Sequence, residues 1–226
     1  MDTATRDKWD HAARFFDLMS GHGPEWRWKP AKQAFFARMR PDAEILLLAL
    51  GTGLDIPTLP PGRTITAVDI SPRMIERARD RVAAYDGRIT AQVMDVHDMT
   101  FADASFDQVF TSCTFCSVPR PVEGLTALRR VLKPGGELHM FEHTGSHLFP
   151  LSLMMKLLSP VTWRVGPEID RDTVANVRAA GFRVTAVNNI FLDTVKTIHA
   201  VNPGPAGSAF SRKPPAAAAP RSGRPA

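Results

Sequence analysis

Cysteine, long apolar runs and a targeting pattern are scarce or missing in this sequence. Its 226 residues include two cysteines, Cys113 and Cys116, which are too few for a disulfide framework. The longest apolar stretch, 148–158, is interrupted by a proline, a serine and a lysine, and a bilayer span needs about 20 apolar residues. No basic segment followed by an apolar one opens the chain. We therefore expect a cytoplasmic protein without a transmembrane helix.

An excess of charge is also missing from most of the chain. The formal net charge is +5, but residues 202–226 contribute +4 of it through four basic side chains and no acid. The nearly neutral remainder argues against a nucleic-acid-binding groove. Because residues 202–226 are rich in proline, alanine and glycine, we expect them to form a disordered basic tail.

The most informative feature that is present is an apolar run ending in a glycine turn. Residues 45–50 are continuously apolar, as buried strands of parallel sheets are. Gly51 and Gly53 follow, where the backbone can bend sharply and let a ligand lie close. A second strand, 64–69, ends at Asp69, a carboxylate that can accept hydrogen bonds from both hydroxyls of a ribose. The alternative for Asp69 is a solvated acid, but the context favours a nucleoside-containing cofactor.

Strand and helix patterns alternate from residue 44 onward. Alternation of this kind predicts βαβ units and a parallel sheet. We expect strands at 45–50, 64–69, 89–94, 106–112, 137–141, 182–187 and 193–201, and helices at 72–84, 121–132 and 172–180. Two earlier helices within 6–40 are separated by 21–24. The predicted organisation is a helical cap (1–43), an α/β domain (44–201) and the tail (202–226).

The motifs, taken in order, resemble those of the class I S-adenosylmethionine-dependent methyltransferases over about residues 6–201. The matching pieces are the glycine turn, Asp69, Met94-Asp95 at the end of the third strand, Phe106-Asp107-Gln108-Val109, and Val131-Leu132-Lys133-Pro134-Gly135-Gly136 before the fifth strand. The resemblance implies a three-layer Rossmann-like α/β sheet of seven strands, the last antiparallel. It also implies S-adenosylmethionine as the cofactor.

The resemblance further assigns residues to this cofactor. The glycine turn would lie against its methionine part, Asp69 would bind the ribose hydroxyls, and Asp95 would accept from the adenine amino group. The pocket for methyl transfer would be bordered by Ser112 and Cys113. The full implied set is Trp9, Phe16, Ala49, Gly51, Thr52, Gly53, Asp69, Ile70, Met74, Asp95, Val96, Ser112 and Cys113.

Three features depart from the family pattern. Leu47 occupies the place of the acid in strand one, which in the family helps to position the cofactor's ammonium group. Ala49 replaces the first glycine of the turn. Trp9 and Phe16 stand where the family has tyrosines, so the rings are kept and the hydroxyls are lost. These departures leave open a cofactor-binding protein with reduced or lost catalysis.

The sequence offers one candidate base. Methyl transfer from a sulfonium is an in-line displacement that alignment and exclusion of water can catalyse, and a base is needed only for a protonated acceptor. We expect His143, with neighbouring Glu142, to be this base. It stands at the end of the fifth strand, and ligand sites of such sheets lie at the carboxyl ends of the strands. Adjacent strand residues point to opposite faces, so only one of them can face the substrate. The alternative is that His143 merely closes the strand by a hydrogen bond. His139, in mid-strand, is expected to be packed.

Neither cysteine is expected to bind a metal. Two thiols cannot complete a structural zinc site, and no second ligand cluster is evident. Because Cys113 and Cys116 follow the fourth strand, we expect them to line the pocket.

The acceptor is predicted to be apolar. Residues 51–57 resemble bacterial phospholipid N-methyltransferases and the group that includes ubiquinone C-methyltransferases, whereas 113–118 resemble membrane-associated thiol methyltransferases. Segments 26–40 and 147–165 mix apolar and basic side chains, which suits contact with a membrane interface. Alternatively both segments, 26–40 and 151–158, pack over the site as a lid, and either arrangement favours an apolar acceptor. The leading hypothesis is N-methylation of phosphatidylethanolamine at the inner face of the membrane; the alternative is a soluble enzyme acting on a small thiol or quinol.

Overall fold

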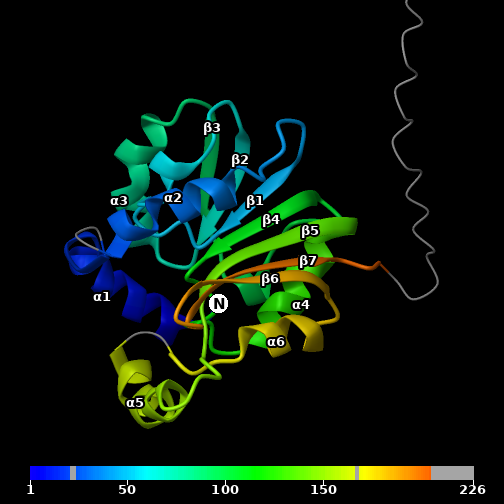
Figure 1. The fold of residues 1–226 in the computed structure, drawn as a ribbon. Coiled ribbons are helices and arrows are strands. Elements are labelled where there is room, and N and C mark those ends of the chain that lie inside the picture. Colours follow the sequence, from blue (N-terminus) through cyan, green and yellow to red (C-terminus); the bar gives the residue numbers. More distant parts are fainter. Residues whose placement is uncertain (21–23, 166–167, 205–226) are drawn as a thin grey trace, which may run out of the picture.

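A central β-sheet with helices on both faces organises the chain (Figure 1). The structure, a computed structural model, describes residues 1–20, 24–165 and 168–204. Its helices are α1 (Thr3–Ser20), α2 (Pro24–Phe36), α3 (Pro72–Ala83), α4 (Pro121–Val131), α5 (Leu151–Val165) and α6 (Thr173–Ala179), with short 3₁₀ turns η1 (Ile56–Thr58) and η2 (Val96–Asp98). Its strands are β1 (Ile45–Leu48), β2 (Thr64–Asp69), β3 (Arg88–Val93), β4 (Phe106–Ser112), β5 (Leu132–His143), β6 (Arg183–Phe191) and β7 (Val195–Val201).

The strand order explains where a ligand can bind. The seven strands lie in the order β3-β2-β1-β4-β5-β7-β6. Strands β1 to β5 pair in parallel, and β7 runs antiparallel to both of its neighbours. The order reverses between β1 and β4, and ligands of such sheets bind at the carboxyl ends of the strands beside that reversal. The predicted seven-stranded fold is confirmed.

Two apolar cores lie on opposite faces of this sheet. Alternation along β1 sends Leu46 and Leu48 to the core beneath α4 and α6, and Ile45 and Leu47 to the core beneath α2 and α3. Both faces of β1 are therefore covered, which is why its sequence is apolar without a break. Figure 1 shows α4 and α6 on one side of the sheet and α2 and α3 on the other.

Several predicted boundaries differ from the observed ones. Strand β1 ends at Leu48 instead of residue 50, because Ala49 has a φ of +58° and leaves the strand conformation. Strands β5 and β6 end later than predicted, since pairing with β7 continues to its first residue, Val195, which faces both His143 and Phe191. Strand β5 also begins earlier, at Leu132, which pairs with Phe106 of β4. The register within an antiparallel pair is invisible to local sequence pattern.

The ordered chain also continues past residue 201. Asn202 is buried, and its side-chain amide donates to the carbonyl oxygens of Arg129, Leu132 and Lys133. Asn202 thus belongs to the α/β domain and not to the tail. The rest of the predicted tail, 205–226, and most of the predicted break at 21–24 lie outside the described residues.

We expect Ala49→Gly to stabilise the protein. A left-handed conformation costs an L-residue roughly 1–2 kcal/mol, part of which the greater flexibility of unfolded glycine offsets. The free energy of unfolding in urea should rise by about 0.5–1 kcal/mol. An unchanged or lower value would mean that neighbouring contacts of the Ala49 methyl group outweigh the strain.

Candidate functional site

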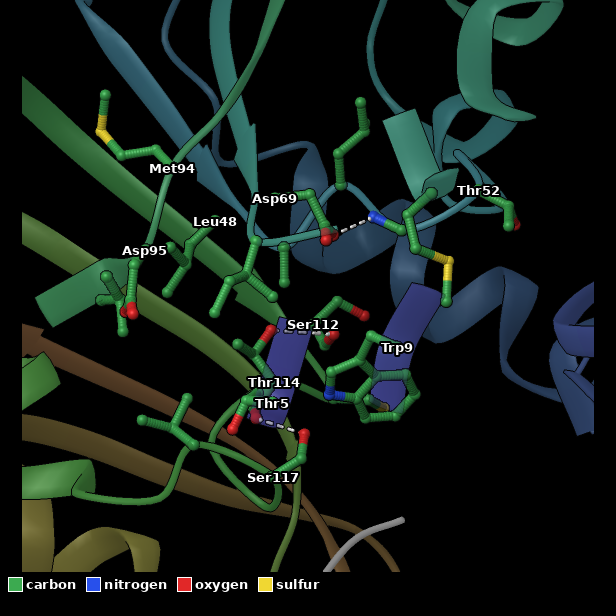
Figure 2. A pocket seen from close by; sticks show the side chains of 18 of the residues that line it. Thr5, Trp9, Leu48, Thr52, Asp69, Met94, Asp95, Ser112, Thr114 and Ser117 are labelled. Atoms are coloured by element: carbon green, nitrogen blue, oxygen red, sulfur yellow. Dashed lines mark hydrogen bonds between the residues drawn. The ribbon is translucent and has the colours of Figure 1, made fainter. Parts of the chain in front are cut away.

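A cavity opens at the carboxyl ends of β1, β2 and β4, beside α1 (Figure 2). Helix α1 and the residue before it contribute Asp2, Thr5, Trp9 and Phe16, and α2 contributes Lys32. The remaining lining residues are Leu48, Ala49, Leu50, Gly51, Thr52, Leu54, Asp55, Asp69, Ile70, Met74, Met94, Asp95, Val96, His97, Ser112, Cys113, Thr114, Ser117, Val118 and Pro119. Twelve of the thirteen residues predicted to hold a cofactor are among them.

Asp69 is fixed in the cavity wall by backbone donors. Its carboxylate accepts from the N–H of Gly51 at 2.8 Å and from the N–H of Ser71 at 2.9 Å. Burial raises its pKa to about 6, and these hydrogen bonds offset the rise only in part. Each carboxylate oxygen has two lone pairs, so acceptor capacity remains for a ligand. A Cβ built on Gly51 would meet nothing within 4 Å, so the backbone borders open space here.

Asp95 lies across the cavity from Trp9 in Figure 2. One of its carboxylate oxygens accepts from the N–H of Asp2 at 2.7 Å, and the other accepts from the N–H of His97 and lies 2.8 Å from His97 Nδ1. Burial alone would raise the pKa of Asp95, but these hydrogen bonds outweigh it and lower the pKa. An ionised acceptor therefore faces the cavity near neutral pH.

Ser112 indicates that the cavity suits a polar ligand. Its hydroxyl is buried in the wall and makes no hydrogen bond within the part of the chain that the structure describes. Buried hydroxyls without partners are rare in folded proteins. With two carboxylates and apolar walls, this orphaned group fits a nucleoside ligand.

Helix α1 closes one side of the cavity and is held there by two acids. Asp10 accepts from the hydroxyl of Ser71 and from the N–H of Arg73, at the start of α3. Asp17 accepts from the hydroxyl of Thr52 at 2.5 Å and from Arg81 at 3.0 Å. The cap is thereby connected to the glycine turn and to the helix that follows Asp69.

Lys32 and Asp55 were missed by sequence reasoning. Lys32 Nζ lies 2.7 Å from an oxygen of Asp55 and 5.8 Å from the centroid of the Phe141 ring. The sequence signal that could have identified Lys32 is its spacing. It lies four residues after Trp28 and three before Phe35, on the apolar face of the helix. A charge in that position marks a side chain that packing alone does not explain.

The structure does not bring the two predicted catalytic residues to the cavity. Glu142 points to the face covered by α4 and α6, where it is fully buried and accepts from Thr111 Oγ1 at 2.7 Å and from the N–H of Phe115 at 3.0 Å. His143 points to the other face, and burial lowers its pKa. Its Nδ1 makes no hydrogen bond to any described residue. The prediction of opposite faces was right, whereas the role as a base has no support in this placement.

Four further residues differ in how far their positions agree with the prediction. Gly53, predicted to touch the cofactor, lies behind the cavity with a φ of +82°, and a Cβ there would come within 2.9 Å of Ile56 Cδ1. Cys113 lines the cavity as predicted, whereas Cys116 is buried outside it. His139 is packed as predicted, stacked on Phe110.

Known proteins resemble this chain in sequence. The methyltransferase domain family matches residues 46–140. A demethylmenaquinone methyltransferase of Symbiobacterium thermophilum is 34% identical over 79% of this chain and 73% of its own length. The ubiquinone/menaquinone biosynthesis C-methyltransferase of Geotalea daltonii is 37% identical over 55% of this chain. The match spans only 54% of that relative's length.

Solved structures share the fold at low sequence identity. A phospholethanolamine N-methyltransferase of Haemonchus contortus, solved with phosphomonomethylethanolamine and S-adenosylhomocysteine, has a TM-score of 0.65 at 17% identity, over 88% of this chain and 60% of that one. A methyltransferase of Aquifex aeolicus has a TM-score of 0.62 at 17% identity, over 82% of this chain and 96% of that one. These matches show a common fold.

Proposed function

Because the chain belongs to the class I S-adenosylmethionine-dependent methyltransferases, we propose that it transfers a methyl group to an apolar, lipid-like acceptor at a membrane surface. The observation that supports methyl transfer from this cofactor is the pair of carboxylates, Asp69 and Asp95, which face one cavity at the ends of neighbouring strands. The proposal of a membrane surface rests on helix α5.

Several residues of the cavity would hold the nucleoside part of the cofactor. Asp69 would accept from the ribose hydroxyls, and Asp95 from the adenine amino group, with Val96 beside the ring. Ser112 offers an unused hydroxyl, and Trp9 covers the cavity from α1. When bound, S-adenosylmethionine supplies the activated methyl group on its sulfonium. The protein's part is then to align the acceptor with that methyl group and to exclude water.

Helix α5 and the two residues Leu148 and Phe149 before it leave an apolar surface exposed. Figure 1 shows α5 standing off the sheet. None of the described residues 151–158 lines the cavity, so the structure gives the predicted lid role of this segment no support. Met155 alone among its described apolar side chains is fully packed. The large apolar side chains exposed along this surface are Leu148, Phe149, Leu153, Met154, Leu157 and Leu158.

Charge complementarity supports an anionic bilayer as the partner of this surface. Residues 144–167 contain a lysine and an arginine and no acid. An apolar face combined with basic residues is typical of helices that lie in a lipid interface. The described aromatic side chains of segment 26–40 do not form such a face, because Trp28 contacts Phe141 and Phe191 and both Phe35 and Phe36 are buried. No described helix is long and apolar enough to cross a bilayer.

The amine of phosphatidylethanolamine is our first candidate acceptor. Relatives of this chain include a phosphatidylethanolamine N-methyltransferase of Cereibacter sphaeroides, 29% identical over 51% of this chain and 58% of its own length. The second candidate is a quinol, which the names of the two relatives described above favour. Purified protein with labelled S-adenosylmethionine and vesicles containing one acceptor or the other separates the two. Cofactor binding without transfer to either acceptor would support the alternative of lost catalysis.

Removing exposed apolar side chains from the α5 surface should release the protein from vesicles. Phe149 and Leu157 are 81% and 71% exposed, so Phe149→Ser with Leu157→Ser should leave the fold intact. Each apolar side chain inserted in lipid contributes roughly 1–2 kcal/mol, and we expect sedimentation with anionic vesicles to fall by about tenfold or more. Val187→Ser, exposed on β6, is the control and should sediment normally. Equal binding of both variants would contradict the membrane proposal.

A further inference from the structure

The Lys32–Asp55 ion pair has no role in the account given so far. It joins the cap helix α2 to the segment after the glycine turn, and both residues line the cavity. The Lys32 side chain is 4% exposed and that of Asp55 is 20% exposed. Two opposite charges thus stand side by side in the wall of a binding cavity.

Packing alone gives a weak reason to keep a charge here. Taking an ammonium out of water costs several kcal/mol, and the attraction of a buried partner often only balances that cost. Lys32 lies over the ring of Phe141, in the core that also contains Phe35 and Leu47. A leucine or methionine would suit such a site. A ligand that needs both charges gives a better reason.

The position of the pair identifies the part of the ligand concerned. Asp69 and Asp95, which suit the nucleoside, line the cavity beyond β2 and β3. Asp55 lies instead four residues after Gly51, in the segment that continues the turn and lines the same cavity through Thr52 and Leu54. The amino-acid portion of the cofactor is a zwitterion, with one ammonium and one carboxylate group. A lysine is complementary to the carboxylate of this group, and an aspartate beside it is complementary to the ammonium.

We propose that Asp55 and Lys32 bind the amino-acid end of the cofactor, Asp55 through its ammonium group and Lys32 through its carboxylate. This inference rests on the proposed function. It also accounts for Leu47, because the acid missing from β1 is replaced by Asp55 from the following segment. The cap then contributes a charged contact to the cofactor as well as a hydrophobic cover.

Two ligands that differ only at this end test the proposal by calorimetry. S-adenosylhomocysteine carries the zwitterion, whereas 5′-methylthioadenosine keeps the nucleoside and lacks the amino-acid portion. We expect Asp55→Asn and Lys32→Met each to weaken binding of S-adenosylhomocysteine by about tenfold or more, the usual effect of losing a charged hydrogen bond. Binding of 5′-methylthioadenosine should change by less than about twofold, since a distant contact leaves other binding energies nearly unaffected.

A second ion pair provides matched controls. Lys133 Nζ lies 2.8 Å from Asp107 at the amino ends of β4 and β5, away from the cavity. Lys133→Met and Asp107→Asn should leave both affinities unchanged, and thermal unfolding of all four variants reports whether they fold. Equal loss for both ligands, or no loss for either, would overturn the role of Lys32 and Asp55. If neither ligand binds the unaltered protein, the proposed function itself fails.

Discussion

Asp69→Ala is expected to weaken binding of S-adenosylhomocysteine by roughly 1–3 kcal/mol, or about 5- to 150-fold. The carboxylate is buried, held by the N–H groups of Gly51 and Ser71, and faces the cavity. Its removal leaves the ligand hydroxyls without an acceptor in a site that excludes water. Titration calorimetry measures the change directly, and unchanged affinity would mean that Asp69 is not the residue that binds the ribose.

The same side chain should make cofactor binding depend on pH. The pKa of Asp69 is raised by burial to about 6, and the ionised form accepts hydrogen bonds better than the acid. Affinity for S-adenosylhomocysteine should therefore be full above pH 7 and fall by about tenfold at pH 5, where most of the group is protonated. Asp69→Asn removes this titration, and its weaker affinity should vary little over the same range.

The unaltered protein is expected to lose stability as the pH rises because Glu142 ionises, and the variant Glu142→Gln should not show this loss. Burial raises the pKa of Glu142 to about 7 from an ordinary value of 4.5, although Thr111 and the N–H of Phe115 donate to it. Between these two values the folded state binds more protons than the unfolded state, so stability falls with rising pH. The shift corresponds to about 3 kcal/mol at full ionisation.

Comparing the Glu142→Gln variant with the unaltered protein isolates the titration of Glu142. A glutamine can accept from the N–H of Phe115 and donate to Thr111, whose hydroxyl rotates to suit. We expect the free energy of unfolding of Glu142→Gln, relative to the unaltered protein, to increase by about 3 kcal/mol between pH 4.5 and pH 8. Urea titrations at the two pH values measure it. A difference that stays constant with pH would show that Glu142 is not protonated in the folded state at neutral pH.

The sequence was sufficient for the sheet and for placing Asp69 and Asp95 at one cavity. A continuous apolar run predicted β1, and the acid at the end of β2 lies in the cavity as expected. These features depend on residues that are close together in the chain, and local pattern records them well.

Contacts between distant segments could not be predicted in this way. Lys32 and Asp55 meet only because α2 packs over the segment after the turn. Glu142 follows the expected alternation, but its burial depends on the loop after β4, which places the N–H of Phe115 against it. Helix α5 has the composition of a buried helix, and only its position relative to the sheet leaves it exposed.

Helix α1 has a kinetic consequence for turnover. It forms one wall of the cavity through Trp9 and Phe16 and is attached by Asp10 to Ser71 and by Asp17 to Arg81. A spent cofactor leaving on that side has to wait until these attachments break. Since the Asp17–Arg81 ion pair weakens in salt, we expect product exchange on that side to become faster as the salt concentration rises.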